Sequence, residues 1–376
     1  MENPLTANAG QNIYVRNKMS YQNEQEAVVR GKVETAKREK LKREKPEVFE
    51  KILTIKERQE KKIPTPLIDI AYDYRCNLRC RHCAANCMTP KENKLTPAVL
   101  RRLSEEADAL GLCQFVVSGG EPLLFPDLPE VMEALQPNRF HIAMSTNGHF
   151  MTPEKAVELK KMGLDKVKIS LDDFDPELHD QNRGKSGAFE KALNALKYCK
   201  DADLAATIQA VVTHQNCRTD RTVKMAKFAQ EMGYNLDIII ARAIGQWEGK
   251  HEVLIDREDA DFLWQLHQEY PCLHRDTFPA FGMHVGCGCV KALLHITPYG
   301  DVFPCVFIHV SIGNIFEESL ADIIKRGNSI KWFSCHSPIC LSGENRYFIE
   351  NYMSKFYGKP LPVSWKDVFT EKDFIQ

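Results

Sequence analysis

The chain has no long apolar run and almost no net charge. Its 376 residues contain no stretch of roughly eighteen apolar residues, and no basic segment followed by an apolar one opens the sequence. Lys and Arg number 50 against 51 Asp and Glu, so no basic surface for nucleic acid is indicated. We therefore expect a cytoplasmic, enzyme-sized chain that neither inserts stably into a membrane nor binds nucleic acid.

Cysteine, by contrast, is abundant, with 13 residues. In a long chain without an export signal this indicates metal or redox chemistry rather than a disulfide framework. Cys76, Cys80 and Cys83 lie within eight residues, too crowded to make a disulfide framework without partners from elsewhere in the chain. A Cys-x3-Cys-x2-Cys run supplies three thiolates from one loop, which suits three irons of a [4Fe–4S] cubane and leaves the fourth open to a non-protein ligand. A zinc site using Cys80 and Cys83 is the alternative.

This stretch resembles the cluster loop of radical S-adenosylmethionine (SAM) enzymes, including Asn77 and Leu78 after the first cysteine. In that family SAM chelates the open iron, and an electron from the cluster cleaves SAM to give a 5′-deoxyadenosyl radical. The resemblance implies a [4Fe–4S] cluster with SAM on the three cysteines and an electron donor of flavodoxin or ferredoxin type. The family usually has an aromatic residue before the third cysteine, against the adenine. Here it is His82, whose imidazole can stack in a similar way.

From Leu67 the chain repeats a strand, loop and helix unit of roughly 30 to 40 residues, which is typical of parallel strands joined by crossover helices. The predicted strands are 67–74, 114–117, 140–145, 167–171, 204–213 and 236–241. The predicted helices are 97–110, 127–135, 153–162, 187–199 and 219–232. Six such strands resemble the partial (β/α)6 barrel of the radical SAM family, an α/β fold whose functional loops follow the carboxyl ends of the strands.

The first 65 residues differ from this pattern, because Lys and Arg alternate there with Glu and few apolar side chains intervene. This predicts an exposed helical arm, in which the helically spaced apolar residues between Val48 and Ile55 could dock on the main domain. We expect five segments in order: the arm 1–65, the barrel 66–245, a connecting helical segment 246–286, an auxiliary cluster domain 287–345 and an aromatic tail 346–376.

Polar residues follow the predicted strands. Ser118-Gly119-Gly120-Glu121-Pro122 after the second strand looks like the GGEP motif of the family, in which the glycines allow close approach and the carboxylate can accept the ammonium of SAM. A plain Gly-Gly turn is the alternative. Ser-x-Asp after the fourth strand implies a contact of Asp172 with ribose, and Arg183 resembles an arginine near the SAM carboxylate, with a surface ion pair as the alternative.

The resemblance thus implies cofactor contacts by the following residues: His82, Gly119, Gly120, Glu121, Ser145, Asn147, Ser170, Asp172 and Arg183. Three further residues are candidates for substrate or SAM contacts by their position alone: Gln209, His214 and Arg242.

A second set of cysteines begins at Cys287. Cys289, ten residues, Gly300, four residues and Cys305 match the opening of the auxiliary-cluster domains called SPASM, or twitch in their short form. Alternating residues on both sides of Gly300 predict a β-hairpin with a thiolate at each end. The resemblance implies a small twitch-like hairpin and helix domain with one auxiliary [4Fe–4S] cluster, whose expected ligands are Cys289, Cys305, Cys335 and Cys340. Cys287 is a rival for Cys289, and a tetrathiolate zinc site is the alternative.

Full ligation by cysteine leaves no open iron, so we expect the auxiliary cluster to accept an electron. The other cysteines are typical of buried small hydrophobes. One that faces the substrate can instead donate a hydrogen atom to a substrate radical. Cys217 and Cys272, in predicted loops, are the candidates for this catalytic role.

Together these features predict a radical SAM oxidoreductase or maturase. We expect oxidative modification of a ribosomal peptide, such as crosslinking, dehydrogenation or epimerisation, because the arm and the aromatic tail could shape a large site. Against this, the arm lacks the strand and helix alternation of a leader-peptide recognition domain. The alternatives are the same chemistry on a sugar, lipid or other small intermediate, and a non-catalytic iron–sulfur or zinc scaffold.

Overall fold

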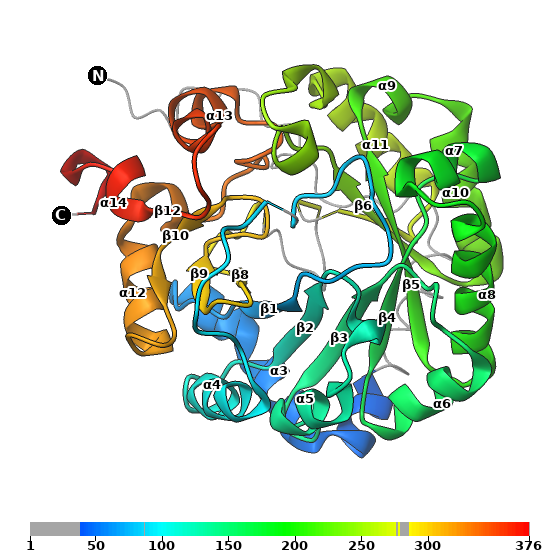
Figure 1. The fold of residues 1–376 in the computed structure, drawn as a ribbon, viewed down its shortest axis with the longest axis horizontal. Helices are drawn as coiled ribbons and strands as arrows, with labels where there is room; N and C mark the ends of the chain where they lie inside the picture. Colours follow the sequence, from blue (N-terminus) through cyan, green and yellow to red (C-terminus); the bar gives the residue numbers. More distant parts are fainter. Residues whose placement is uncertain (1–37, 86, 276, 279–285, 376) are drawn as a thin grey trace.

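Six parallel strands form the centre of the fold (Figure 1). The computed structural model describes residues 38–375, with gaps at residues 86, 276 and 279–285. The strands are β1 Leu67–Asp73, β2 Gln114–Gly119, β3 His141–Thr146, β4 Lys166–Ser170, β5 Ala205–Val212 and β6 Asn235–Ile240. They pair in sequence order. All six predicted strands are confirmed, each within two residues of its expected bounds.

The crossover helices cover the outer side of the curved sheet, as Figure 1 shows. They are α4 Pro97–Ala109, α5 Leu128–Ala134, α6 Pro153–Lys161, α7 Pro176–Arg183, α8 Ala188–Asp201 and α10 Asp220–Met232. Local chemistry sets several of their starts. Thr96, Thr152 and Asp175 each accept a backbone N–H at the helix N-cap, and each is followed by a proline at the first helical position. The short helix α7 was not among the predicted helices.

The sheet continues beyond the barrel strands at both edges. Its full order is β11-β9-β8-β1-β2-β3-β4-β5-β6-β7. The added strands are β7 Leu273–His274, β8 Leu293–Ile296, β9 Asp301–Phe303 and β11 Gly313–Asn314. The predicted hairpin is present as β8 and β9, and β8 also pairs in parallel with β1, so that Asp69 lies opposite His295. The hairpin is therefore continuous with the barrel sheet.

The strands alternate between an apolar and a polar face. On β3, Ile142 and Met144 are fully buried in the core that packs against the helices. Most of the residues that alternate with such core positions are polar or small, although Val116, Val211 and Ile239 are apolar. The polar or small ones include Asp69, Ser118, His141, Ser145, Lys168, Ser170, Gln209 and Asp237. Because the interior of a complete (β/α)8 barrel is filled by branched apolar side chains, this inner face is not a packed core of that kind.

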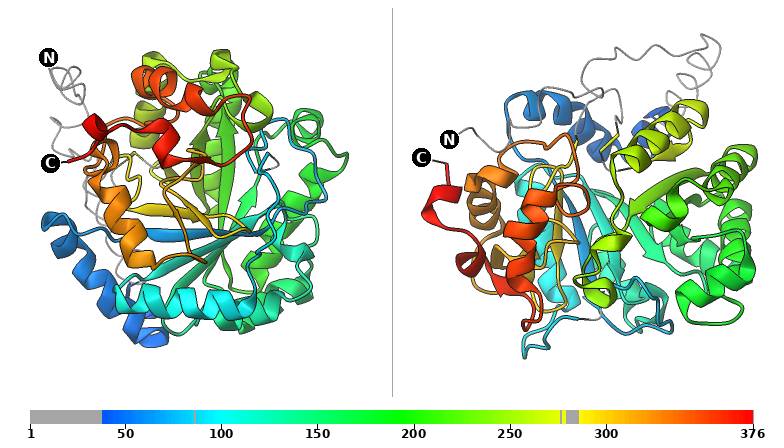
Figure 2. Two further views of the ribbon diagram at one scale, coloured as in Figure 1. Left: turned by 60° about the vertical axis from the view of Figure 1, so that its left-hand side comes forward. Right: turned by 90° about the horizontal axis from the view of Figure 1, so that it is seen from above.

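The helix near the start of the described chain and the C-terminal segment lie at separate places on the molecule (Figure 2). The helix α3, Pro46–Glu60, docks through the fully buried Val48, and the ammonium of Lys45 just before it pairs with Asp165 at 2.5 Å. The first 37 residues of the predicted arm lie outside the described residues.

The remaining elements are α9 His214–Cys217, α11 Arg257–Glu269, α12 Leu320–Ser329, α13 Arg346–Asn351, α14 Trp365–Val368 and the strand pair β10 Val310–Ser311 with β12 Val363–Ser364. In the aromatic tail, Phe348 and Phe356 are buried, and Phe348 stacks on Tyr352. No described helix is both long and apolar enough to cross a bilayer.

Candidate active site

The loop after β1 carries three thiols, those of Cys76, Cys80 and Cys83, all of them partly buried. Burial raises the pKa of the Cys76 and Cys80 thiols, and the neighbouring Cys83 raises both further, so the three sulfurs share one electrostatic environment. At Cys80 the positive charge of Arg183 acts in the opposite direction and favours the thiolate. The loop thus offers three sulfur ligands together, beside one cation.

Close backbone packing holds this loop in place. A Cβ on Gly120 would lie 2.0 Å from the carbonyl oxygen of Arg75, and one on Gly245 would lie 2.3 Å from that of Cys83. Neither contact is sterically possible, so only glycine lets the ends of β2 and β6 approach the loop so closely. Glu121, which follows Gly120, donates its N–H to the Arg75 carbonyl at 2.9 Å. Gln246, which follows Gly245, donates its N–H to the Cys83 carbonyl at 3.1 Å.

Glu121, the acidic residue of the Gly-Gly-Glu-Pro motif, is fully buried. Its carboxylate accepts hydrogen bonds from the Thr146 hydroxyl at 2.5 Å, from the Asn147 N–H at 2.8 Å and from the Leu123 N–H at 3.1 Å. It therefore ties the end of β2 to the end of β3. The predicted contact of Glu121 with the SAM ammonium stays a prediction, for which the carboxylate keeps unused lone pairs beside these three bonds.

A buried ion pair lies on the other side of the loop. Arg183 Nη2 donates to Asp172 Oδ1 at 2.7 Å, with side chains only 9% and 2% exposed. Burial is the largest single influence and acts to raise the pKa of Asp172, but the charge of Arg183, together with His82, His179 and the Val211 N–H, holds that pKa below its ordinary value. The surface ion pair that we considered for Arg183 is thus a buried one, and Arg183 Nη1 lies 4.0 Å from the sulfur of Cys80.

Three buried polar atoms around the loop have no hydrogen-bond partner among the described residues: Asn77 Nδ2, Asp172 Oδ2 and Arg183 Nε. Two are donors and one is an acceptor, and all three belong to residues beside the thiols. Buried polar groups are normally hydrogen-bonded, so this set fits a polar ligand with both hydroxyl and carboxylate groups. The side-chain amide of Asn147 lies beside these atoms and has a partner, since it donates to Asn77 Oδ1 at 2.9 Å.

His82 packs against Trp247, with ring centroids 5.8 Å apart. Burial lowers the pKa of His82 to about 4, so its imidazole is neutral at neutral pH and offers a flat, uncharged ring. Trp247 follows β6 and was not among the predicted site residues, although an aromatic residue after a strand end is a recognisable signal. Ser145 and Ser170 lie partly exposed at the ends of β3 and β4.

A second group of thiols lies beyond β8. Cys287, Cys289, Cys305 and Cys340 are all buried, and the sulfurs of Cys287 and Cys289 are 3.7 Å apart. Cys287 also contacts Cys340, and Cys289 contacts Cys305, so the four form one continuous group. Cys335 is exposed. The group therefore differs from the expected ligand set at one position, with Cys287 included and Cys335 outside.

The spacing of Cys287 and Cys289 explains this difference. Residues two apart on an extended chain point to the same side, so both thiols can serve one site instead of competing for one position. Cys287 forms an antiparallel bridge with Ser337, with N–H to O distances of 2.7 and 3.0 Å, which brings it beside the segment that carries Cys340.

Comparison with known protein families matches both thiol groups. The family described as "Radical SAM superfamily" matches residues 73–226, and the SPASM family, described as "Iron-sulfur cluster-binding domain", matches residues 287–343. The chain belongs to the radical SAM superfamily. Its cofactors are a [4Fe–4S] cluster with SAM and auxiliary iron–sulfur, and the donor sets fit them, with three thiols in the cysteine loop and four buried thiols in the SPASM region.

Curated relatives of this radical SAM protein differ in activity. It is 30% identical over 262 residues to mycofactocin maturase MftC of Mycolicibacterium smegmatis, which covers 65% of this chain and 66% of that one. It is 24% identical over 274 residues to the AdoMet-dependent heme synthase of Methanosarcina barkeri, at 66% and 78% coverage.

The fold is also that of solved radical SAM structures. Streptococcus suis SuiB bound to S-adenosylmethionine matches with a TM-score of 0.59 at 18% identity, covering 84% of this chain and 80% of that one. The native enzyme anSMEcpe with bound AdoMet matches with a TM-score of 0.54 at 22% identity, covering 74% and 84%.

The two cysteines predicted as hydrogen donors contact backbone carbonyls in this radical SAM fold. Cys217 is fully buried and its thiol donates to the Asp259 carbonyl at 3.6 Å, while the thiol of Cys272 contacts the Ala226 carbonyl of α10 at 3.5 Å. Cys87, which had no predicted role, is partly exposed. Burial raises the pKa of its thiol, and the neighbouring Cys83 raises it further. The structure thus gives Cys217 and Cys272 no geometric support, and the role stays a prediction.

His214, one of the positional candidates, has an ion-pair partner of its own. His214 pairs with Asp259 at 2.6 Å, which Arg218 also contacts at 2.9 Å, so these residues join α9 to α11.

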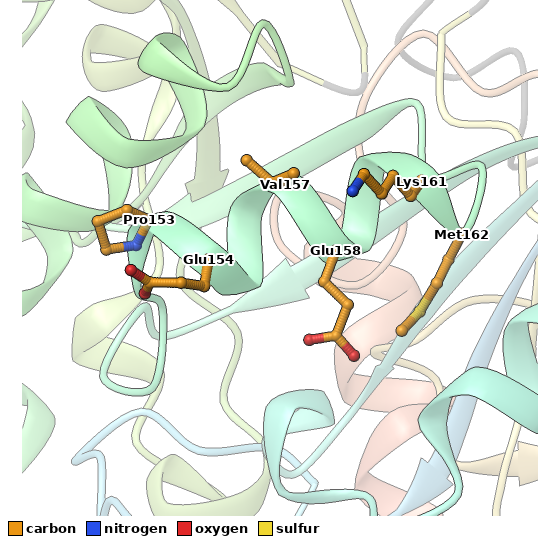
Figure 3. Close-up of a pocket in the computed structure, with 6 residues that line it drawn as sticks. All are labelled: Pro153, Glu154, Val157, Glu158, Lys161 and Met162. Atoms are coloured by element: carbon orange, nitrogen blue, oxygen red, sulfur yellow. The ribbon is translucent and has the colours of Figure 1, made fainter.

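The hollow in Figure 3 lies on the outer surface of α6 and its end, away from the strand ends. It is lined by Pro153, Glu154, Val157, Glu158, Lys161 and Met162.

Proposed function

We propose that this radical SAM protein oxidatively modifies a ribosomally made peptide and passes one electron of that reaction to its auxiliary cluster. The observation that carries the proposal is that the two groups of thiols offer different numbers of ligands to a cluster. Three thiols in the cysteine loop leave one iron of a cubane for SAM, whereas four thiols in the SPASM region close their site. A closed cluster has no iron for a substrate, which favours electron transfer.

When bound, the first cluster with SAM supplies the 5′-deoxyadenosyl radical that removes a hydrogen atom from the substrate. Net oxidation then requires that one electron and one proton also leave the substrate. The chain's own residues orient SAM in this proposal. Asn77, Asp172 and Arg183 offer the unpartnered buried polar atoms for its ribose and carboxylate, and His82 offers a neutral ring for its adenine. We assign the auxiliary ligands as Cys287, Cys289, Cys305 and Cys340.

A peptide substrate is supported by the relatives. MftC is a mycofactocin maturase, and a SuiB structure bound to its precursor peptide SuiA matches 86% of this chain with a TM-score of 0.59. The polar inner face of the sheet, with Lys168 and Asp237 at 3.8 Å, suits a polar substrate. The heme synthase relatives favour a second candidate, the same chemistry on a small biosynthetic intermediate such as a heme precursor.

The test begins with the chain reconstituted anaerobically with iron and sulfide. We expect about eight irons per chain for two cubanes, and 5′-deoxyadenosine from SAM with dithionite. Incubation with a short peptide encoded beside the gene is then expected to give a product two hydrogens lighter by mass spectrometry. Cys76→Ala is the matched control and should abolish both products. The proposal fails if a heme precursor is converted and the peptide is not, and catalysis is refuted if wild-type protein forms no 5′-deoxyadenosine.

A further inference from the structure

Arg242 connects the end of β6 to the auxiliary thiols. It lies two residues beyond the strand and is 5% exposed. Its Nη1 donates to the carbonyl oxygen of Ile240, and its Nη2 donates to the sulfur of Cys340 at 3.4 Å. The guanidinium also lies over the ring of Phe307, 4.1 Å from the centroid, and Phe307 is two residues beyond Cys305. One side chain thus contacts the barrel and two cysteine-bearing segments.

The segment that carries Cys340 is fitted tightly to the same strand end. A Cβ on Gly343 would lie 2.6 Å from the side chain of Ile240, so the chain there approaches β6 as closely as glycine allows. The N–H of Cys340 donates to Glu344 at 2.8 Å, and Glu344 in turn pairs with the buried Arg275 at 2.5 Å. Cys340 is therefore held through its backbone by a contact that does not involve Arg242.

Two side chains of different kinds lie within hydrogen-bond distance of the Cys340 sulfur. Arg242 is a permanent cation, whereas Ser342 Oγ, 3.5 Å from the same sulfur, is neutral. Both would form charge-assisted hydrogen bonds to a thiolate, but only the guanidinium also brings a full positive charge to the sulfur. Reduction of an iron–sulfur cluster adds one negative charge, and hydrogen bonds to its sulfurs and nearby net charge set how readily that happens.

We propose that Arg242 is a positioning residue that raises the reduction potential of the auxiliary cluster through its hydrogen bond to the Cys340 sulfur. This rests on the proposed function in one respect, namely that the auxiliary cluster receives the electron from the substrate. The cluster gains one electron, the substrate loses it, and Arg242 remains protonated throughout because its guanidinium does not titrate in this range. Its place at the end of β6 puts the favourable charge on the barrel side of the auxiliary site.

The test is an EPR-monitored redox titration of the full chain in a background where Cys76, Cys80 and Cys83 are alanine, so that only the auxiliary cluster contributes. Arg242→Gln is expected to lower the equilibrium constant for reduction about tenfold, which is about 59 mV for a one-electron couple. Arg242→Lys keeps the charge and should shift the potential less, as should Ser342→Ala, which removes the neutral donor. Arg326→Gln, which removes an arginine paired with Glu318, is the control and should leave it unchanged.

A wild-type potential in Arg242→Gln with four irons retained would overturn the proposal. A shift in Arg242→Lys as large as that in Arg242→Gln would do the same, since charge would not be the cause. Loss of the auxiliary irons in both variants would assign Arg242 a structural role instead. Failure of the proposed function is distinguishable, because it appears as missing peptide product in wild-type protein while the potentials still shift.

Discussion

Replacement of Arg183 by glutamine tests the ion pair beside the cysteine loop. In the folded chain, Asp172 Oδ1 accepts from Arg183 at 2.7 Å and from the Val211 N–H at 3.0 Å, and its Oδ2 has no partner among the described residues. The variant therefore leaves a carboxylate that is 2% exposed with one backbone donor. Removing one member of a buried ion pair costs about 3 to 5 kcal/mol, so we expect a loss of that size in the free energy of unfolding at neutral pH.

The loss should depend on pH with a definite sign. In the wild type the pKa of Asp172 is held low, so the pair stabilises the fold above the unfolded pKa of Asp, about 3.9, and this stability is lost as pH falls through the lower folded value. Without Arg183 burial dominates and the folded pKa rises above the unfolded one. Protonation in mild acid then relieves the buried charge, so the deficit of Arg183→Gln relative to wild type should shrink as pH falls.

Urea unfolding of the metal-free chain under reducing conditions, at neutral and mildly acidic pH, measures both effects. Arg101→Gln is the matched control, since Arg101 pairs with Glu105 at 3.4 Å with side chains 51% and 63% exposed, and such pairs contribute about 0 to 1 kcal/mol. The double variant with Asp172→Asn should recover part of the loss. If Arg183→Gln loses no more than Arg101→Gln, or if its deficit grows in acid, the argument for a buried pair is refuted.

Three further predictions concern the auxiliary thiols, the cysteine loop after β1 and the imidazole ring of His82. Cys287→Ala should lose the auxiliary irons whereas Cys335→Ala keeps them, as iron analysis of the reconstituted chain would show; the opposite pattern would restore Cys335 as the ligand. Gly120→Ala places a methyl 2.0 Å from a carbonyl oxygen of the loop. It should therefore lower the free energy of unfolding, measured in urea, by about 1 to 3 kcal/mol and reduce cluster loading. A variant with wild-type stability and loading would contradict the contact. His82→Ala should weaken SAM binding about tenfold in equilibrium dialysis and His82→Phe should not, since the ring supplies stacking; equal affinities in all three proteins would remove His82 from the adenine site.

The barrel strands and the motifs at their ends were predictable from sequence because both depend on local order. Alternation of apolar and polar residues predicts a strand such as β3. Its Ile142 and Met144 face the helices, and Ser145 faces the other side of the sheet. Parallel strands bring their carboxyl ends to one edge of the sheet, which is why the cysteine loop, the Gly-Gly-Glu-Pro turn and Asp172 could be expected to lie near one another. The contacts of each site residue with SAM remain predictions.

The sequence by itself determined the chemistry of the cluster loop, because three thiols in eight residues restrict the ligand set whatever surrounds them. Only the tertiary structure decided that Cys287 joins the auxiliary thiols, that β8 pairs with β1, and that Arg242 contacts Cys340. Each of these contacts joins residues far apart in the chain. Such pairings depend on how whole elements pack, and residue spacing alone does not specify them.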